Sequence, residues 1–327
     1  MNNFLFSLNA TIPVFLVIVL GFVLRRTGLL TEEFAHVGDR LTFRVTLPVM
    51  MFAELSVVDW RDSFDLRFFL FCAIVSCVAF AVIYGLCWVF IKDRSMIGTF
   101  SMVSFRGSAA VLGIAFVKNI YGNVGFAPLM IAAVVPFYNI FSVVALAISA
   151  SRDDTEGEDA GETGKPEFSA WKVLREVITN PLIVAVVLAI PAALLHWTDW
   201  SGSTVPYKFL SSVGNMATPL ALLTLGAGFE RHEAVSRVKP VIAASVVKLI
   251  LLPALFVPLA VYFGFRDAQL LAIAVMLASP TTVACYIMAK NMKNDAALAS
   301  GTVLVTTLFS SVTITVTVLL LRCFALI

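Results

Sequence analysis

Charged residues are scarce in this chain: 13% of its 327 residues are Asp, Glu, Lys or Arg, whereas 60% are hydrophobic. Soluble domains carry about 25% charged and about 45–50% apolar residues. A single water-soluble core does not grow much beyond about 250–300 residues, so it could not hide this much apolar surface. The scarcity of charge therefore excludes an ordinary soluble domain and indicates that a bilayer surrounds most of the chain.

Residues that carry catalysis or hold metals are also scarce. The chain has three histidines, near the ends of apolar runs, and five cysteines that form no CxxC or Cys/His spacing. Paired carboxylates inside the apolar runs, a GxSxG motif and a basic tail for nucleic acid are missing from the sequence. We therefore expect no enzyme activity, no metal, no cofactor and no nucleic-acid partner.

Long apolar runs are abundant, and each one of about 20 residues can cross a bilayer as a helix. The first run lacks the positively charged start of a signal peptide and is interpreted as a retained helix. About ten transmembrane helices are predicted, at residues 4–24, 36–55, 68–91, 95–117, 119–151 (with the helix beginning near Gly125), 178–195, 209–229, 241–265, 268–289 and 296–321.

The loops predict the orientation, because cytoplasmic loops carry an excess of Lys and Arg. The more basic side includes residues 151–176, which therefore form an acidic cytoplasmic linker or, alternatively, a docking loop. Phe168, Trp171, Leu174 and Ile178 recur at helical spacing and predict a short interfacial helix after it. We expect a multi-pass protein of the cytoplasmic (inner) membrane with both termini outside.

The two halves share three landmarks at a nearly constant offset of about 170 residues, as an internal repeat does. The landmarks are Pro13 with Pro181, Pro48 with Pro219, and Lys118-Asn119 with Lys290-Asn291. Each half has an odd number of spans, so the second enters the membrane from the opposite side. This predicts two inverted five-helix repeats, residues 1–150 and 177–327, as in many secondary transporters. Chance likeness between apolar helices is the alternative.

A substrate site is expected near the midplane, where interrupted helices leave backbone groups for a ligand. The ninth span contains Pro280, and the hydroxyls of Thr281 and Thr282 beside it can bind a substrate or the loosened backbone. The fourth span is its counterpart, with Gly107, Gly113 and other small residues. An ordinary proline kink is the alternative in the ninth span, and the small residues of the seventh span favour close helix packing.

Polar side chains within the spans are the candidate ligands. Arg106 is the one charge of the fourth span; its guanidinium costs about 2.5–3.5 kcal/mol at mid-membrane, so it should face a polar interior, and its planar fork suits a carboxylate. It is either an anion clamp or half of a structural pair. Pro136 can loosen the fifth span, while Tyr138 and Asn139 can bind a carboxylate or join helices. Lys248 in the eighth span is either similar to Arg106 or, as we expect, snorkels to the nearer membrane surface.

Several segments, in order, resemble the auxin efflux carrier family, whose members include plant auxin carriers and bacterial malonate and organic-anion carriers. These segments are TLPVMMFAEL, FRGSAAVLGIAF, PFYN, MATPLALLTLGAGF and ASPTTVACYIMAKNMKNDAALASG. The resemblance implies crossing helices four and nine, a scaffold of helices one, two, six and seven that is often dimeric, and an elevator-like movement of the rest. By position it assigns the site to Gly107, Ser108, Asn139, Pro280 and Thr281. The chain departs from the family at Ser108, where Asn is usual, and at Ala115, where Pro is usual.

We therefore predict an all-α membrane protein that is a secondary transporter of a small organic anion, either malonate-like or auxin-like, and a homodimer. The alternatives are a sodium-coupled symporter of bile-acid-symporter-like architecture and a non-transporting sensor. Acidic residues often help to hold a cation, but they are nearly absent from the spans, and Glu54 lies at a span end. Strong sodium coupling is therefore less favoured, although carbonyls, Asn and Thr can also coordinate sodium. The predicted substrate-binding residues are Arg106, Gly107, Ser108, Tyr138, Asn139, Pro280, Thr281 and Thr282, and the predicted hinge residues are Gly113, Pro136 and Pro280.

Overall fold

The computed structural model describes residues 2–56, 64–108, 117–118, 120–121, 125–156, 170–194, 204–229 and 236–327, and the regular elements of these residues are helices. The first half contains α1 (Asn2–Arg26), α2 (Glu32–Leu41), the π-helix η1 (Thr42–Thr46), α3 (Leu47–Ser56), α4 (Leu66–Phe90), α5 (Met96–Phe105) and α7 (Ala127–Glu156). The rest contains α8 (Ala170–Thr179), α9 (Pro181–Leu194), α10 (Val205–Asn215), α11 (Ala217–Ala227), α13 (Val238–Val246), the π-helix η2 (Val247–Leu251), α14 (Leu252–Tyr262), α15 (Asp267–Ala278), α16 (Ala284–Asn291) and α17 (Ala296–Cys323).

The all-α membrane fold predicted from composition is confirmed. Within the described part of the chain, five helical stretches are long and apolar enough to cross a bilayer: Leu66–Phe90, Ala127–Ala150, Val205–Ala227, Val238–Tyr262 and Ala296–Cys323. Three shorter apolar helices accompany them, at Met96–Phe105, Pro181–Ala193 and Asp267–Ala278. The inverted relation between the two halves stays a prediction.

Side-chain caps set where several helices begin. The carboxylate of Asp65 accepts the backbone N–H of Phe68 at 3.0 Å at the start of α4, and the hydroxyl of Thr31 accepts that of Phe34 at 3.1 Å at the start of α2. Such caps satisfy N–H groups that have no partner within the helix. They lie where the sequence changes from polar loop to apolar run, which explains why the observed helices begin within a few residues of the predicted spans.

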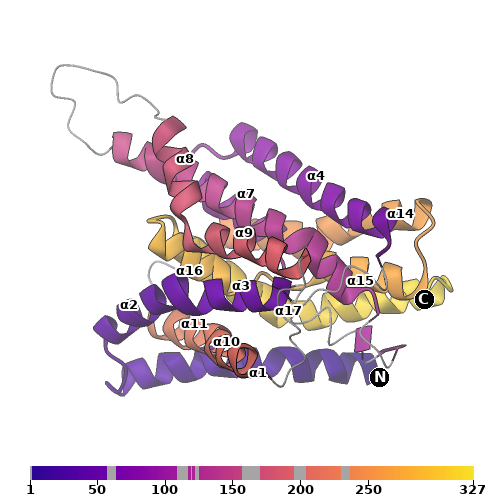
Figure 1. The fold of residues 1–327 in the computed structure, drawn as a ribbon, viewed down its shortest axis with the longest axis horizontal. Coiled ribbons are helices and arrows are strands. Elements are labelled where there is room, and N and C mark those ends of the chain that lie inside the picture. Colours follow the sequence, from indigo (N-terminus) through magenta and orange to yellow (C-terminus); the bar gives the residue numbers. More distant parts are fainter. Residues whose placement is uncertain are drawn as a thin grey trace.

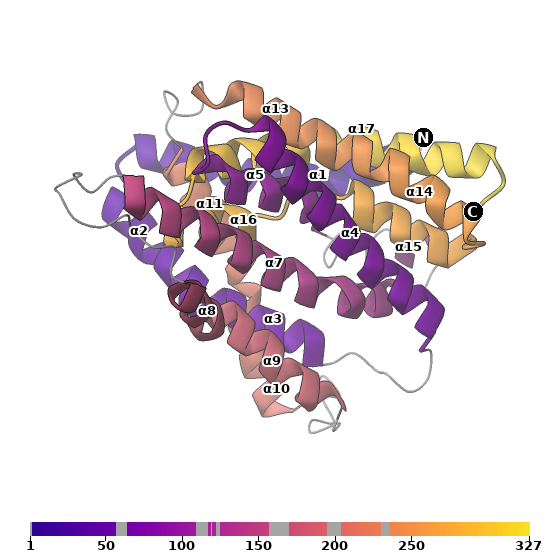
Figure 2. The same ribbon diagram turned by 90° about the horizontal axis from the view of Figure 1, so that it is seen from above.

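The helices pack in two groups. In the first, α1 packs on α11, α2 packs on α11, and α3 packs on α9 and α10. In the second, α4, α5 and α7 pack on one another, α17 packs on α13 and α16, and α14 packs on α15. Contacts between α1 and α17 join the groups. Figures 1 and 2 show most helices running lengthwise, with the start of α1 and the end of α17 at the same end of the molecule.

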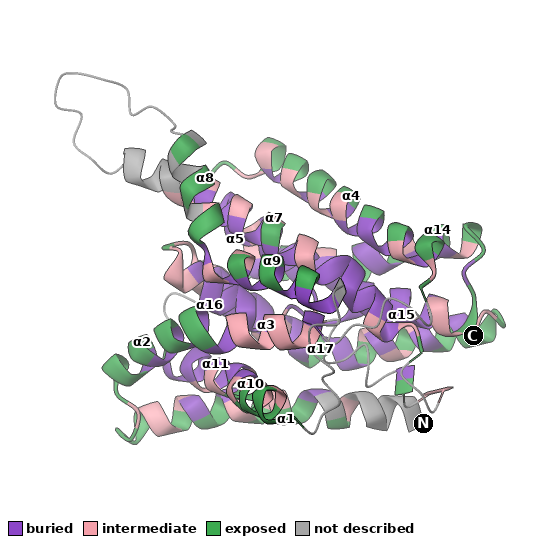
Figure 3. Ribbon diagram, viewed as in Figure 1, coloured by how far each residue is buried: buried purple, intermediate pink, exposed green. Residues whose placement is uncertain are grey.

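Burial follows this arrangement. Figure 3 shows exposed stretches along the outer sides of α1, α4 and α9, and large apolar side chains such as Leu16, Ile74 and Val187 are exposed there. Every residue of α15 from Leu270 to Ala278 is buried instead. An apolar outer surface around a buried centre is what lipid contact requires, because lipid cannot hydrogen-bond polar groups. The interrupted helices therefore lie in the interior of the protein.

Helix is present at both ends of the predicted acidic linker, which itself stays a prediction. Helix α7 continues to Glu156, and α8 begins at Ala170, so helix extends into both ends of residues 151–176. The short helix predicted there is present, and Trp171, Leu174 and Ile178 are exposed on it. Phe168 lies outside the described residues, and contact of this helix with a membrane surface stays a prediction.

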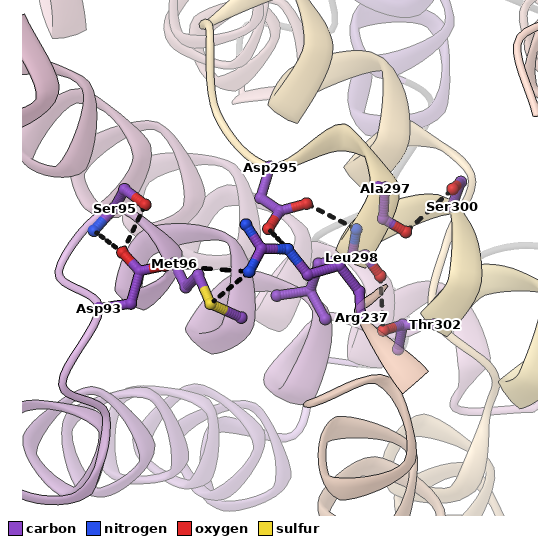
Figure 4. A network of polar contacts seen from close by, with 9 residues as sticks. All are labelled: Asp93, Ser95, Met96, Arg237, Asp295, Ala297, Leu298, Ser300 and Thr302. Carbon is purple, nitrogen blue, oxygen red and sulfur yellow. Dashed lines mark hydrogen bonds and ion pairs between the residues drawn. The ribbon is translucent and has the colours of Figure 1, made fainter. Parts of the chain in front are cut away.

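Arg237 ties three loops together at the end of the molecule opposite the termini (Figure 4). Its Nε lies 2.8 Å from Oδ2 of Asp295, and its Nη1 lies 3.9 Å from Oδ2 of Asp93. Asp295 also caps α17, because its Oδ1 accepts the N–H of Leu298 at 2.8 Å. This network fixes the start of α13 against the starts of α5 and α17. We call this end of the molecule, where α1 also ends and α2 begins, the basic end.

Candidate functional site

Two helix interruptions meet in the buried centre. Helix α5 ends at Phe105, and α15 and α16 are separated by residues 279–283. Gly107 and Thr281 form an antiparallel β-bridge, and the N–H of Ser108 donates to the carbonyl of Pro280 at 2.8 Å. Pro280 offers no backbone N–H, and the residue before a proline is biased to extended geometry, which Ser279 adopts with φ −64° and ψ 148°. We call residues 106–108 and 279–283 the crossing segments.

Side chains satisfy the backbone groups that these interruptions free. The hydroxyl of Thr281 donates to the carbonyl of Val103 at 2.7 Å, and its N–H donates to the hydroxyl of Thr306 at 3.1 Å. Nζ of Lys248 donates to the carbonyl of Phe105 at 3.3 Å. Of the two uses expected for Thr281, backbone capping is the one observed here.

The expectation that Lys248 snorkels is wrong. Its side chain lies in the π-helix η2 and is fully buried, pointing to the end of α5 and not to a membrane surface. An orphan carbonyl at a helix C-terminus attracts a cation, because the helix dipole is negative there. The carbonyl of Phe105 therefore holds the ammonium inside the protein.

Position 107 has no room for a side chain, which explains why it is a glycine. A Cβ at this position would lie 2.3 Å from Oγ of Ser279 and 2.8 Å from Nζ of Lys248. Real Cβ atoms do not approach other heavy atoms this closely, so any larger residue would displace the side chains that hold the crossing segments. The glycine lets the two extended segments lie side by side.

Arg106 is buried, with 3% of its surface exposed. Its Nη1 lies 3.0 Å from Sδ of Met288 and 3.5 Å from the hydroxyl of Ser142. Both are weak partners for a guanidinium, and no carboxylate lies within 4.0 Å of it among the described residues. A buried cation with no carboxylate in direct contact is costly, so an anion that reached it would be stabilised.

The crossing segments border a cavity of about 110 Å³, which we call the central cavity. The described residues that line it come from α1, α3, α7, α11, α16, α17 and both crossing segments. Of the predicted substrate-binding residues it is lined by Arg106, Gly107, Ser108, Tyr138, Pro280, Thr281 and Thr282. The structure thus brings seven of the eight predicted substrate-binding residues, which come from three separate segments of the sequence, to the central cavity.

The remaining candidates lie elsewhere. Asn139 is fully buried beside the cavity and does not line it; its Nδ2 donates to the carbonyl of Val135 at 2.9 Å and lies 3.3 Å from Sδ of Met51. Pro136 lies inside the continuous helix α7. Gly113, and with it Ala115, lies outside the described residues. Substrate contact by Asn139 and hinge roles for Pro136 and Gly113 stay predictions.

Glu54 is the cavity residue whose role sequence reasoning missed. It lines the central cavity, and its Oε2 is buried without a hydrogen-bond partner among the described residues. The span-end position of Glu54 concealed this role. The sequence signal was the single carboxylate within TLPVMMFAEL, which matches the family segment.

The start of α16 adds a further positive field. Its first residue, Ala284, lines the central cavity together with Thr282 and Val283. The N–H groups of Cys285 and Tyr286 donate to the carbonyls of Thr282 and Val283, both at 3.0 Å, and the helix dipole makes this end of α16 electropositive. Arg106 and a helix N-terminus therefore add positive potential at the cavity, which the carboxylate of Glu54 opposes.

A small cavity that borders a buried arginine, where interrupted helices cross inside an all-α membrane protein, is typical of a membrane transporter. A family profile described as "Membrane transport protein" matches residues 6–318. The chain belongs to this family, which is the auxin efflux carrier family that its segments resemble. It is 26% identical over 327 residues to a protein of Rhizobium meliloti (strain 1021) named "Putative malonate transporter", with 96% of each chain covered. A lipid bilayer and a small-molecule substrate are accordingly its partners.

Proposed function

We propose that this transporter carries a small organic anion of the size and charge of malonate, and that Arg106 binds its carboxylate. The observation that carries the proposal is the buried guanidinium of Arg106, which borders the central cavity with only a thioether and a hydroxyl as partners in the described part of the chain. Arginine binds carboxylates through two parallel hydrogen bonds, and such charge-assisted bonds are the strong ones. The carboxylate of a substrate would supply the direct ion pair that Arg106 lacks, since Glu54 borders the same cavity but lies more than 4.0 Å from the guanidinium.

The size of the cavity favours malonate-like over auxin-like substrates. Its volume of about 110 Å³ is well below the roughly 300–1,000 Å³ of pockets for drug-sized ligands. A short carboxylate fits such a space, whereas a bicyclic aromatic acid needs more room. The second carboxylate of a dicarboxylate could reach the hydroxyl of Thr282 or the N-terminus of α16, which both border the cavity. The name of the Rhizobium meliloti relative supports the same substrate class.

An elevator-like movement suits the position of the site. The central cavity lies at the border between the two helix groups, because α1, α3 and α11 line one side and the crossing segments line the other. Movement of the second group against the first would carry a ligand held by Arg106 across the membrane. Family membership favours such transport over the sensor alternative.

Uptake of radiolabelled malonate into proteoliposomes tests the proposal. Arg106→Ala should lower the initial rate about tenfold to hundredfold, since hydrogen bonds to charged groups contribute about 1.5–3 kcal/mol. Arg106→Lys keeps the positive charge but lacks the planar guanidinium, so its initial uptake rate should lie between those of Arg106→Ala and the unmodified protein. Arg44→Ala is the matched control, because Arg44 belongs to a predicted span, is exposed and does not line the central cavity.

Unchanged uptake by Arg106→Ala, reconstituted in equal amount, would remove Arg106 from the site. If the uptake rate falls equally in Arg106→Ala and Arg44→Ala, the cause is the loss of a positive charge in general. This result would also count against the proposal.

A further inference from the structure

A second, larger pocket lies at the basic end, with a volume of about 300 Å³, and we call it the basic-end pocket. Helices α1, α2, α16 and α17 and the residues after α11 line it. Its polar lining residues include Arg25, Arg26, Glu32, His36, Tyr286 and Lys290. It therefore lies between the two helix groups, as the central cavity does.

Basic side chains outnumber acidic ones in this pocket. Glu32 is engaged by Arg25, whose Nη2 lies 3.3 Å away, and by His36, whose Nε2 lies 4.0 Å away. Arg26 lies over the ring of Phe22, 5.2 Å from its centroid, and has no carboxylate within 4.0 Å in the described part of the chain. A concave surface lined by one sign of charge concentrates ligands of the opposite sign. The pocket therefore attracts anions.

Lys290 joins this pocket to a buried carboxylate. Its Nζ lies 2.7 Å from Oδ2 of Asp39 and donates to the hydroxyl of Tyr286 at 3.0 Å. The side chain of Lys290 is 24% exposed and that of Asp39 only 3%. Nδ2 of Asn291 also donates to the backbone carbonyl of Asp39 at 3.3 Å. These contacts tie α16 in the second group to α2 in the first.

The ion pair between Lys290 and Asp39 does not use all the hydrogen-bonding groups of either residue. Oδ1 of Asp39 is buried and has no hydrogen-bond partner among the described residues. The ammonium of Lys290 has three N–H donors, and the pocket exposes part of it. A second carboxylate entering the pocket can therefore bind Lys290 and compete with Asp39.

Helix α16 connects this pocket to the central cavity. Its first residue, Ala284, lines the central cavity, while Tyr286 and Lys290 line the basic-end pocket. Six residues of helix separate Ala284 from Lys290, which is about 9 Å along the axis. One rigid turn-and-a-half of helix thus has an anion-binding region at each end.

We propose that the basic-end pocket is a second binding site for the transported anion, in which Lys290 and Arg26 hold a small carboxylate on its way to or from the central cavity. The proposal rests on the proposed function of the central cavity. The bound carboxylate shares the ammonium of Lys290 with Asp39 and so loosens α16 from α2. Arrival of the substrate thereby weakens a contact that holds the two helix groups together.

Equilibrium binding of radiolabelled malonate to the purified full chain at low ionic strength tests the second site. The unmodified protein should bind two malonates per chain, one more weakly than the other. Lys290→Gln should abolish the weaker event and keep the tighter one, and Arg106→Ala should do the reverse. Lys293→Gln is the matched control, because Lys293 lies at the same end and does not line this pocket.

The variant Asp39→Asn tests whether Asp39 competes with the bound carboxylate for Lys290 or has only a structural role. Removing the competing carboxylate frees Lys290, so the weaker event should become tighter by roughly threefold or more, because a half-buried ion pair contributes more than an exposed one. If Lys290→Gln fails to fold, Arg26→Gln at the exposed end of α1 should weaken the same event without disturbing the ion pair.

Two malonates per chain in Lys290→Gln, or a single event in the unmodified protein that Arg106→Ala removes, would overturn the second site and leave the central site intact. Loss of only the weaker event in Arg106→Ala would overturn the proposed function and leave the second site standing.

Discussion

Buried polar side chains at the crossing segments divide into two kinds. Thr281, Thr306 and Lys248 satisfy backbone groups that the helix interruptions leave without partners. Thr281 also borders the central cavity; Arg106 and the half-buried Thr282 border it as well, and Arg106 lacks a strong partner in the described part of the chain. The first kind holds the extended segments in place at low energetic cost, and the second kind remains for a ligand.

Glu54 should weaken anion binding through its charge. Its carboxylate borders the same cavity as Arg106, so it repels an anionic ligand and competes with it for the guanidinium. We expect Glu54→Gln to lower the KM for malonate uptake about threefold to tenfold, which corresponds to roughly 0.7–1.4 kcal/mol. Initial rates across a range of malonate concentrations in proteoliposomes measure this.

Glu33→Gln removes an equal charge from the exposed first turn of α2 and should leave KM unchanged. A KM that rises in Glu54→Gln would contradict this prediction, and a rise that depends on sodium would favour the sodium-symporter alternative.

At the scale of elements, close backbone contact holds α1 against α11. A Cβ at Gly21 would lie 2.3 Å from the carbonyl oxygen of Leu223, and one at Gly226 would lie 2.0 Å from that of Ile18. Helices in membranes associate through such small residues, because lipid provides no hydrophobic drive between them. The packing role predicted for the small residues of the seventh span is in accord with this contact.

Gly226→Ala should destabilise the protein by forcing these two helices apart. Overpacking costs about 1–3 kcal/mol where only side chains must adjust, and here the obstacle is backbone. We expect a clearly lower midpoint of thermal unfolding in detergent. Gly85→Ala on α4 is the matched control, because nothing lies within 4 Å of its added Cβ, and alanine is the better helix former. Equal midpoints for the two variants would contradict close α1–α11 packing.

At the scale of the whole molecule, the distribution of charge separates the two ends. Figure 1 shows the start of α1 and the end of α17 at one end, and the α1–α2 turn at the other. Arg25, Arg26 and Lys290 line a pocket at the latter end, and Arg237 lies in a network there. The predicted orientation therefore places the basic-end pocket in the cytoplasm, where substrate concentration would act on Lys290.

Thiol labelling tests this orientation. Cys323 is exposed at the end of α17, so a membrane-impermeant maleimide should label the unmodified protein in intact cells. Leu29, in the α1–α2 turn, is 72% exposed, and Leu29→Cys in a Cys323→Ala background should be labelled only after the cells are permeabilised. The Cys323→Ala protein alone provides the background signal. Labelling with the opposite sidedness would reverse the predicted topology.

The sequence alone was enough for the all-α membrane class, for the positions of the apolar helices and for the break at Pro280. These features depend on local properties: the length of an apolar run sets a membrane span, and a proline removes a backbone donor wherever it occurs. The resemblance to the family also pointed to the pairing of the fourth and ninth spans, which Gly107 and Thr281 make by their β-bridge.

Only the tertiary structure decided which face of each helix meets which neighbour. It placed Lys248 on the carbonyl of Phe105, Glu54 in the central cavity, Asn139 behind it, and Lys290 against Asp39. Asp39 and Lys290 are separated by most of the chain, and no local pattern encodes their meeting. Such contacts arise from the packing of whole helices, because the orientation of each helix is set by all its neighbours together.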